Sequence, residues 1–264
     1  MVTGEERERL REAALAAGAC AAGFADPYLP PAVDRDYAAW IAAGNNATMR
    51  WLSEHQPLRA DPATVLPGVR TVISLAFPYL PAERRDPSLP YLPLYAYGRD
   101  YHKALRSLLR PFCSFIEGEY GVRTRVCVDS APVHERAFAL RAGIGRRGLN
   151  GCVITPRHGS FVFLAEVFTT LQVEPDDLSF GECLQCGRCV RACPAGALNG
   201  DGTMDAARCI NYLTIEHPYP LTPAQEKLLH DTNTLVGCDR CLTYSLHRTT
   251  TVKDYHIEDL SLLH

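Results

Sequence analysis

Seven cysteines in the last third of the chain constrain its fold more than any other feature of the sequence. The first four lie in the run C-L-Q-C-G-R-C-V-R-A-C-P over residues 183–194. In this spacing three thiolates hold one iron–sulfur cluster and the fourth reaches across to a second cluster. Gly187 provides the tight turn of such a loop, and Pro194 ends it and leads into an expected short helix over 195–198. The run therefore predicts a protein that moves electrons.

The other cysteines of this set indicate two clusters with unequal ligands. Cys209, Cys238 and Cys241 complete a set of four thiolates with Cys193. The first three cysteines of the run lack a fourth partner, because Ser245 stands four residues after Cys241, where a two-cluster protein has its last cysteine. We expect that position to be open to solvent or substrate, or closed by Ser245 or His247. The expected metal ligands are Cys183, Cys186, Cys189, Cys193, Cys209, Cys238, Cys241 and Ser245.

Other uses of the cysteines fit the sequence less well. A zinc ribbon also uses paired C-x2-C motifs, but its usual gap between pairs is much shorter than the gap here. Disulfides are disfavoured because the total of 11 cysteines is odd and the N-terminus is charged rather than a secretory signal. We therefore expect a reducing, cytoplasmic location. The four remaining cysteines are expected to be small buried side chains: Cys20, Cys113, Cys127 and Cys152.

The composition predicts an α/β domain followed by a smaller cluster domain. The 264 residues are 47% hydrophobic, and the apolar runs are too short to span a membrane. The net charge of -3 provides no overall basic field that would attract nucleic acid. We expect an α/β domain over 1–176, an iron–sulfur domain over 177–248 and a tail over 249–264. Helices are expected over 5–17, 33–43, 101–120 with an interruption at Pro111, and 133–142. Strands are expected over 69–77, 122–128, 152–155 and 160–168. The segments 57–68 and 78–93 are expected to be irregular.

Several motifs in one order resemble the epoxyqueuosine reductase family. They are L-Y-A-Y-G-R-D-Y-H-K (94–103), V-D-S-A-P-V-H-E-R (128–136), A-G-I-G-R-R-G-L-N (142–150), G-S-F-V-F-L-A-E-V-F-T (159–169) and C-I-N-Y-L-T-I-E (209–216). The resemblance implies an α/β domain similar to flavin nitroreductases that binds cobalamin, and a ferredoxin-like domain with two 4Fe-4S clusters. It also implies removal of the epoxide oxygen of a modified tRNA base, with electrons from an external donor of the ferredoxin or flavodoxin type. Reductive dehalogenases share this combination of cofactors.

The same resemblance implies a site around Asp129. The family's aspartate at the matching position is its proposed proton donor, although a residue between a strand and a helix could equally be a helix cap. As a general acid Asp129 would need a raised pKa, which burial against the corrin would provide. Cobalt ligation by histidine is not expected, because the segment D-Y-H lacks the glycine of the D-x-H-x-x-G motif. The expected cofactor-binding residues are Tyr97, Tyr101, His102, Ser130, His134, Arg146 and Arg147.

Four departures from the family pattern favour a changed substrate. They are Ser245, the end of the chain at His264 where tRNA-acting members continue into helical repeats, the arginines of the glycine turn, and His134. We therefore expect a small-molecule substrate or modified nucleoside and disfavour tRNA. Two other functions stay open. One is an enzyme without cobalamin that uses the open iron of the three-cysteine cluster as a Lewis acid, and the other is an electron-transfer or cobalamin-handling protein.

Overall fold

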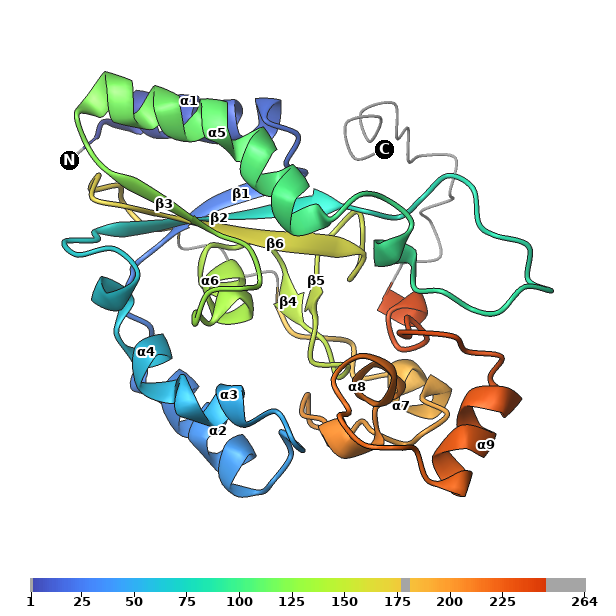
Figure 1. The fold of residues 1–264 in the computed structure, drawn as a ribbon. Coiled ribbons are helices and arrows are strands. Elements are labelled where there is room, and N and C mark those ends of the chain that lie inside the picture. The colour runs from blue at the N-terminus through green and yellow to red at the C-terminus, as the bar shows by residue number, and fades with distance from the viewer. Residues whose placement is uncertain (1, 177–180, 246–264) are drawn as a thin grey trace.

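The computed structural model describes residues 2–176 and 181–245 and is built around a four-stranded antiparallel sheet (Figure 1). The strand order is β1-β2-β6-β3. The strands are β1 (Ala21–Ala25), β2 (Thr71–Pro78), β3 (Thr124–Cys127) and β6 (Val162–Thr169). The central strand β2 pairs with β6 over its full length and is buried from Thr71 to Phe77.

The two faces of the sheet are covered by different helices. Side chains of a strand alternate between faces, so Ile73 and Leu75 of β2 pack against α1 (Gly4–Ala16) and α5 (Tyr101–Tyr120). Val72 and Ala76 lie on the other face in one core cluster with Phe138 of α6 (Glu135–Arg141). Figure 1 shows α1 and α5 together on one side of the sheet and α6 on the other.

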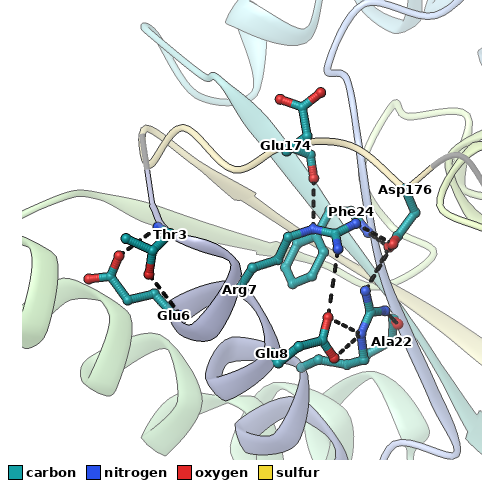
Figure 2. Close-up of polar contacts among 9 residues, drawn as sticks. Thr3, Glu6, Arg7, Glu8, Ala22, Phe24, Glu174 and Asp176 are labelled. Atoms are coloured by element: carbon teal, nitrogen blue, oxygen red, sulfur yellow. Dashed lines mark hydrogen bonds and ion pairs between the residues drawn. The ribbon is translucent and has the colours of Figure 1, made fainter.

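A buried carboxylate fastens α1 to the end of the α/β region. Arg7 Nη2 and Arg11 Nη2 donate to Asp176 Oδ1 at 2.5 and 2.9 Å, and the Phe24 N–H of β1 donates to Oδ2 at 2.8 Å (Figure 2). The Asp176 side chain is only 4% exposed. Thr3 and Glu6 form a capping box that begins the helix carrying both arginines. This network, the Asp176 clasp, holds α1, β1 and residue 176 together.

Helix α5 has the bounds that the sequence predicts. The Asp100 side chain accepts the His102 N–H at 3.0 Å and begins the helix, and Gly121 ends it in a left-handed conformation with φ of 61°. The helix continues through Pro111, where the sequence predicts an interruption. The cap at Asp100 places Tyr101 and His102 on the first turn, beside the end of β3.

Other elements depart from the sequence prediction. The expected helix over 195–198 does not form, because the left-handed conformation of Gly196, with φ of 58°, is incompatible with a right-handed helix. A helix instead precedes Cys193, namely α7 (Arg188–Ala192). The expected loop 57–68 contains most of helix α4 (Gln56–Ala60) and a 3-10 turn, Pro62–Thr64. The elements still to be named are α2 (Pro31–Ala42), α3 (Arg50–Glu54), α4 (Gln56–Ala60), β4 (Arg146–Arg147), β5 (Val153–Ile154), α8 (Ile210–Ile215) and α9 (Pro223–Asp231).

The cysteine-bearing segment packs on the α/β region through polar contacts. Trp40 Nε1 donates to the Met204 carbonyl at 2.7 Å, and Thr48 Oγ1 lies 2.6 Å from the Tyr212 hydroxyl. Asn150 Nδ2 donates to the Cys241 carbonyl at 3.2 Å. The predicted domain boundary at 176 and 177 borders residues outside the described part, and the three-part division stays a prediction. Among the described helices, none is long and apolar enough to cross a membrane.

Candidate functional site

The seven cysteines of the cluster segment are free thiols that lie near one another in two groups. Burial raises the pKa of Cys189, and Cys183 and Cys186 raise it further. Burial likewise raises the pKa of Cys209, and Cys238 and Cys193 add to the effect. These interactions follow the two ligand sets expected from the spacing, and the assignment of each thiol to a cluster stays a prediction.

The surroundings of the sulfur atoms suit thiolate ligands. The Ala197 N–H donates to Cys193 Sγ at 3.3 Å, and Arg240 Nη1 donates to Cys238 Sγ at 3.6 Å. Such donors stabilise the negative charge of a cluster and its thiolates. No three His, Cys, Asp or Glu side chains converge on a single ion position within residues 2–176 and 181–245. A 4Fe-4S cluster does not need such convergence, because each cysteine binds a different iron.

Ser245 is committed to protein partners in this structure. Its hydroxyl donates to the Leu242 carbonyl at 2.6 Å and accepts the Ser160 N–H at 2.7 Å. Ligation of iron by Ser245 would have to replace at least one of these bonds, and that role stays a prediction. The other expected candidate, His247, lies outside the described residues.

Cys152 lies closer to the cluster cysteines than the sequence suggested. Burial raises the pKa of Cys241, and the nearby Cys152 contributes more to that rise than Cys238 does. Cys152 also interacts with Cys189 of the three-cysteine set. From the sequence, Cys152 is predicted to be one of four scattered buried cysteines. The fold shows that the glycine-rich turn places it near Cys241 and Cys189.

Asp129 lies just beyond the end of β3 and faces two side chains from the first turn of α5. The Tyr101 hydroxyl donates to Asp129 Oδ2 at 2.7 Å, and His102 Nε2 lies 3.3 Å from the same oxygen. The backbone of Asp129 has φ of 56°, a left-handed conformation that is uncommon for a residue other than glycine. The residue that precedes α6 as its N-cap is His134, so Asp129 does not cap that helix. Its carboxylate is therefore held toward α5.

The partners of Asp129 are themselves fixed. The Tyr101 ring stacks on Phe163 of β6 with a centroid distance of 4.2 Å and an interplanar angle of 4°. Burial and then the neighbouring Asp129 raise the pKa of Tyr101, so its hydroxyl stays a donor. His102 Nδ1 lies 2.9 Å from Asp100 Oδ1, and this hydrogen bond lowers the pKa of Asp100. Both ring nitrogens of His102 thus face carboxylates.

The carboxyl of Asp129 is largely accessible. Its side chain is 64% exposed, so the protein alone does not supply the burial expected for a general acid. An apolar cofactor face laid against Asp129 would supply that burial. The cluster of Tyr101, His102 and Asp129 is open on the side that such a group would cover.

Two further carboxyls lie beneath Asp129, and the sequence does not reveal them. Glu135 Oε1 accepts the Asp129 N–H at 2.6 Å, and burial raises the pKa of Glu135 to about 7. Glu166 of β6 is fully buried; Ser74 Oγ donates to its Oε1 at 3.1 Å, and its Oε2 has no hydrogen-bond partner. Burial, followed by the nearby Glu135, raises the pKa of Glu166 well above its usual value. Burial therefore favours the protonated form of Glu166.

The remaining predicted site residues are dispersed. Ser130 lies beside Asp129, and its Oγ accepts from Arg106 Nη2 at 2.5 Å. Tyr97 packs against the small core around Leu80 and Phe161 and lines a groove of about 340 Å³.

His134 and the paired arginines take part in contacts away from the Asp129 cluster. His134 Nε2 lies 3.1 Å from Asp34 Oδ1 and its ring meets Tyr37 edge-on, so it joins α6 to α2. Burial lowers its pKa. Arg147 Nη2 donates to the Gly202 carbonyl at 2.9 Å, and Arg146 pairs with Ile154 in the β4–β5 hairpin. Cofactor contacts by these residues stay predictions.

Paired cysteine sets on a small helical segment, docked on an α/β domain, define a double-cluster iron–sulfur protein. The family described as "4Fe-4S double cluster binding domain" matches residues 182–244, and "Epoxyqueuosine reductase QueG, DUF1730" matches residues 59–130. The chain is 43% identical over 206 residues to the epoxyqueuosine reductase of Gloeobacter violaceus, covering 77% of this chain and 64% of that protein. The chain belongs to the epoxyqueuosine reductase family, as the sequence motifs predict.

Solved structures agree with this assignment. A complex of epoxyqueuosine reductase with an epoxyqueuosine-modified tRNA-Tyr stem loop is similar with a TM-score of 0.82 and 28% identity, over 98% of this chain and 68% of that one. The Bacillus subtilis epoxyqueuosine reductase, solved with its catalytic aspartate loop swung out of the active site, is similar with a TM-score of 0.81 and 28% identity, over 96% of this chain and 68% of that one. The predicted fold class, an α/β domain with a ferredoxin-like double-cluster domain, is confirmed.

Proposed function

We propose that this protein is a cobalamin-dependent iron–sulfur reductase that removes the epoxide oxygen of epoxyqueuosine in a tRNA stem loop. The observation that carries the proposal is the convergence of Asp129, Tyr101 and His102 on an open face, in a chain whose cysteine segment matches a double-cluster domain. The chain covers 64% of its Gloeobacter relative, and the activity proposed here is that of the relatives by name.

A tRNA substrate replaces the small molecule expected from the sequence. The structure of the relative bound to a modified tRNA stem loop is similar to 98% of the present chain. This similarity supports tRNA as the substrate. The expectation against tRNA rested on the four departures from the family pattern and on a net charge summed over the whole chain. Local charge is what a phosphate backbone meets, and Arg99, Lys103 and Arg106 are exposed around the start of α5, next to Asp129.

Cofactors would be held by the two parts of the chain. The cysteines of the cluster segment are suited to two 4Fe-4S clusters, and the open face beside Asp129 and Ser130 is the proposed cobalamin face. When bound, these groups would pass electrons from a ferredoxin- or flavodoxin-type donor to the substrate carbon–oxygen bond. Because both ring nitrogens of His102 face carboxylates, His102 would not ligate cobalt.

The chain's own chemical task is proton delivery. Asp129 would donate the proton that the epoxide oxygen needs as it leaves the carbon. The Tyr101 hydroxyl fixes the orientation of Oδ2, and His102 Nε2 is close enough to return a proton to Asp129 after turnover. The B. subtilis relative carries a catalytic aspartate on a loop, and Asp129 also lies on a loop, between β3 and α6.

Replacement of Asp129 tests this role. Asp129→Asn keeps the size of the side chain and an oxygen that can accept from Tyr101, so folding and cluster content should be unchanged. It cannot deliver a proton, so turnover of an epoxyqueuosine-modified stem loop should fall about 10²- to 10⁴-fold. Asp61→Asn, at a capping aspartate of a 3-10 turn, is the matched control and should retain activity. Wild-type turnover by Asp129→Asn would remove Asp129 from the mechanism.

One alternative has structural support. The Ser245 hydroxyl is occupied by Leu242 and Ser160, which would leave one iron of the three-cysteine cluster open to act as a Lewis acid. That enzyme would work without cobalamin. Turnover that needs no added cobalamin would favour it, whereas strict dependence on cobalamin favours the reductase.

A further inference from the structure

Asp129 has a left-handed backbone conformation, and its N–H is bonded to the side chain of Glu135. Its φ of 56° places a non-glycine residue in the left-handed region, which is populated only where the surroundings impose it. The carboxyl of Glu135 accepts the Asp129 N–H at 2.6 Å from six residues further along the chain. This contact joins the two ends of the loop between β3 and α6 through the Asp129 backbone. Tyr101 and His102 of α5 contact the Asp129 side chain instead.

We propose that ionised Glu135 is a positioning residue, which latches the Asp129 loop so that the Asp129 carboxyl faces Tyr101 and His102. The effect of this latch on turnover rests on the proposed function. The contact between Glu135 and the Asp129 loop does not depend on that function. Hydrogen bonds to an ionised acceptor are shorter and stronger than those to a neutral one. Protonation of Glu135 would therefore loosen the latch and let the strained backbone relax.

The groups around Glu135 set when it is charged. Burial raises the pKa of Glu135 to about 7. The hydrogen bond from the Asp129 N–H lowers it, the Asp129 carboxylate raises it, and Arg59 and Arg136 lower it. Both arginines are bonded to carbonyls: Arg59 Nη1 donates to Val133 at 2.6 Å and Arg136 Nη1 to Gly151 at 2.8 Å. The positive charges of the two arginines stabilise ionised Glu135 without replacing its hydrogen bond, which Oε1 accepts from the Asp129 N–H.

Groups on the sheet side also face Glu135. Glu166 of β6 and Cys127 of β3 lie close enough for Glu135 to raise the pKa of each, and Glu135 also contributes to the raised pKa of Tyr101. Burial and the nearby Glu135 both raise the pKa of Glu166, and so disfavour a second negative charge beside Glu135. Glu135 therefore changes charge near neutral pH, and the latch tightens as pH rises through about 7.

Two substitutions separate the charge of Glu135 from its hydrogen bond. Glu135→Gln keeps an oxygen that accepts the Asp129 N–H but cannot titrate, whereas Glu135→Ala removes the acceptor. Wild-type turnover should show a limb that rises with pH around 7. This limb should be absent in Glu135→Gln, whose turnover should stay near the low-pH level of wild type. Glu135→Ala should lose turnover by at least tenfold at every pH. Glu117→Gln is the control, because Glu117 Oε1 accepts the Thr124 N–H at 2.9 Å in the same manner, and its profile should match wild type.

A measurement without substrate separates failure of the latch from failure of the proposed function. Amide hydrogen exchange of residues 128–134, divided by the intrinsic exchange rate of an unstructured peptide at each pH, should be slower at pH 8 than at pH 6 in wild type and in Glu117→Gln. Glu135→Gln should show no such difference, and Glu135→Ala should exchange faster at both values. Equal exchange in wild type and Glu135→Gln at pH 6 and 8, or a pH profile unchanged by Glu135→Gln, would overturn the proposal. Loss of tRNA turnover with the exchange pattern intact would instead count against the proposed substrate.

Discussion

The Asp176 clasp offers the clearest test of how the α/β region is held together. The Asp176 side chain is 4% exposed and faces two guanidinium groups, those of Arg7 and Arg11, which are 23% and 20% exposed. It also accepts the N–H of Phe24 at 2.8 Å. Asp176→Ala would remove its contacts with Arg7, Arg11 and the Phe24 N–H at once. The two partly buried arginines would keep only the exposed carboxylate of Glu8 as an ionic partner.

The expected loss follows from this burial. Removing one partner of a buried ion pair costs about 3 to 5 kcal/mol, because the remaining charge stays uncompensated. For a chain of this size each kcal/mol lowers the melting temperature by about 2 to 4 °C. We therefore expect Asp176→Ala to melt roughly 6 to 20 °C below wild type. Asp176→Asn, which can still accept the Phe24 N–H, should lose less.

An exposed ion pair between α1 and α5 provides the control. Arg9 Nη1 and Glu119 Oε1 are 2.9 Å apart, but their side chains are 54% and 46% exposed. Such pairs contribute about 0 to 1 kcal/mol, so Glu119→Ala should melt within a few degrees of wild type. Anaerobic thermal unfolding followed by circular dichroism makes the comparison. Equal melting temperatures for Asp176→Ala and Glu119→Ala would refute the argument that burial gives the clasp its strength.

Two further substitutions test the clusters and the proton donor. The cluster held by three cysteines should lose iron first in air and give a three-iron signal in electron paramagnetic resonance. Ser245→Cys should make the two clusters equally stable. Identical spectra in wild type and Ser245→Cys would contradict this expectation. Tyr101→Phe keeps the stacking on Phe163 but loses the bond to Asp129, so turnover should fall about 10- to 100-fold, the equivalent of roughly 1.5 to 3 kcal/mol for a hydrogen bond to a charged group. A Tyr101→Phe protein with wild-type turnover would show that this hydrogen bond does not orient the carboxyl.

The sequence predicts the elements whose pattern is local. Helix α5 can be bounded from 101 to 120 because its apolar period, the cap at Asp100 and the stop at Gly121 agree. Strand β1 is missed because Ala21–Ala25 reads A-A-G-F-A, which has little β propensity; its partner β2 makes it a strand. The short helices α3 and α4 are likewise too brief to show a period.

The same limit applies to the site. Cysteine spacing predicts the cluster segment, since the ligands are close in sequence and the spacing is specific. Glu166 could not be recognised, because one acidic residue in an apolar strand does not show which face of the sheet it occupies. Its position opposite α6, near Glu135, depends on strand register and helix packing. The contacts of His134 with Asp34 and Tyr37 are likewise visible only after α2 is placed, and its cofactor contact stays a prediction.

The metal content of the purified protein tests the central claim most directly. The protein would be purified without oxygen, incubated with cobalamin, freed of unbound cofactor, and measured for iron, sulfide and cobalt. The account predicts iron and sulfide for two 4Fe-4S clusters, together with cobalt in a one-to-one ratio to the chain. Complete clusters without retained cobalt would contradict a cobalamin-dependent reductase.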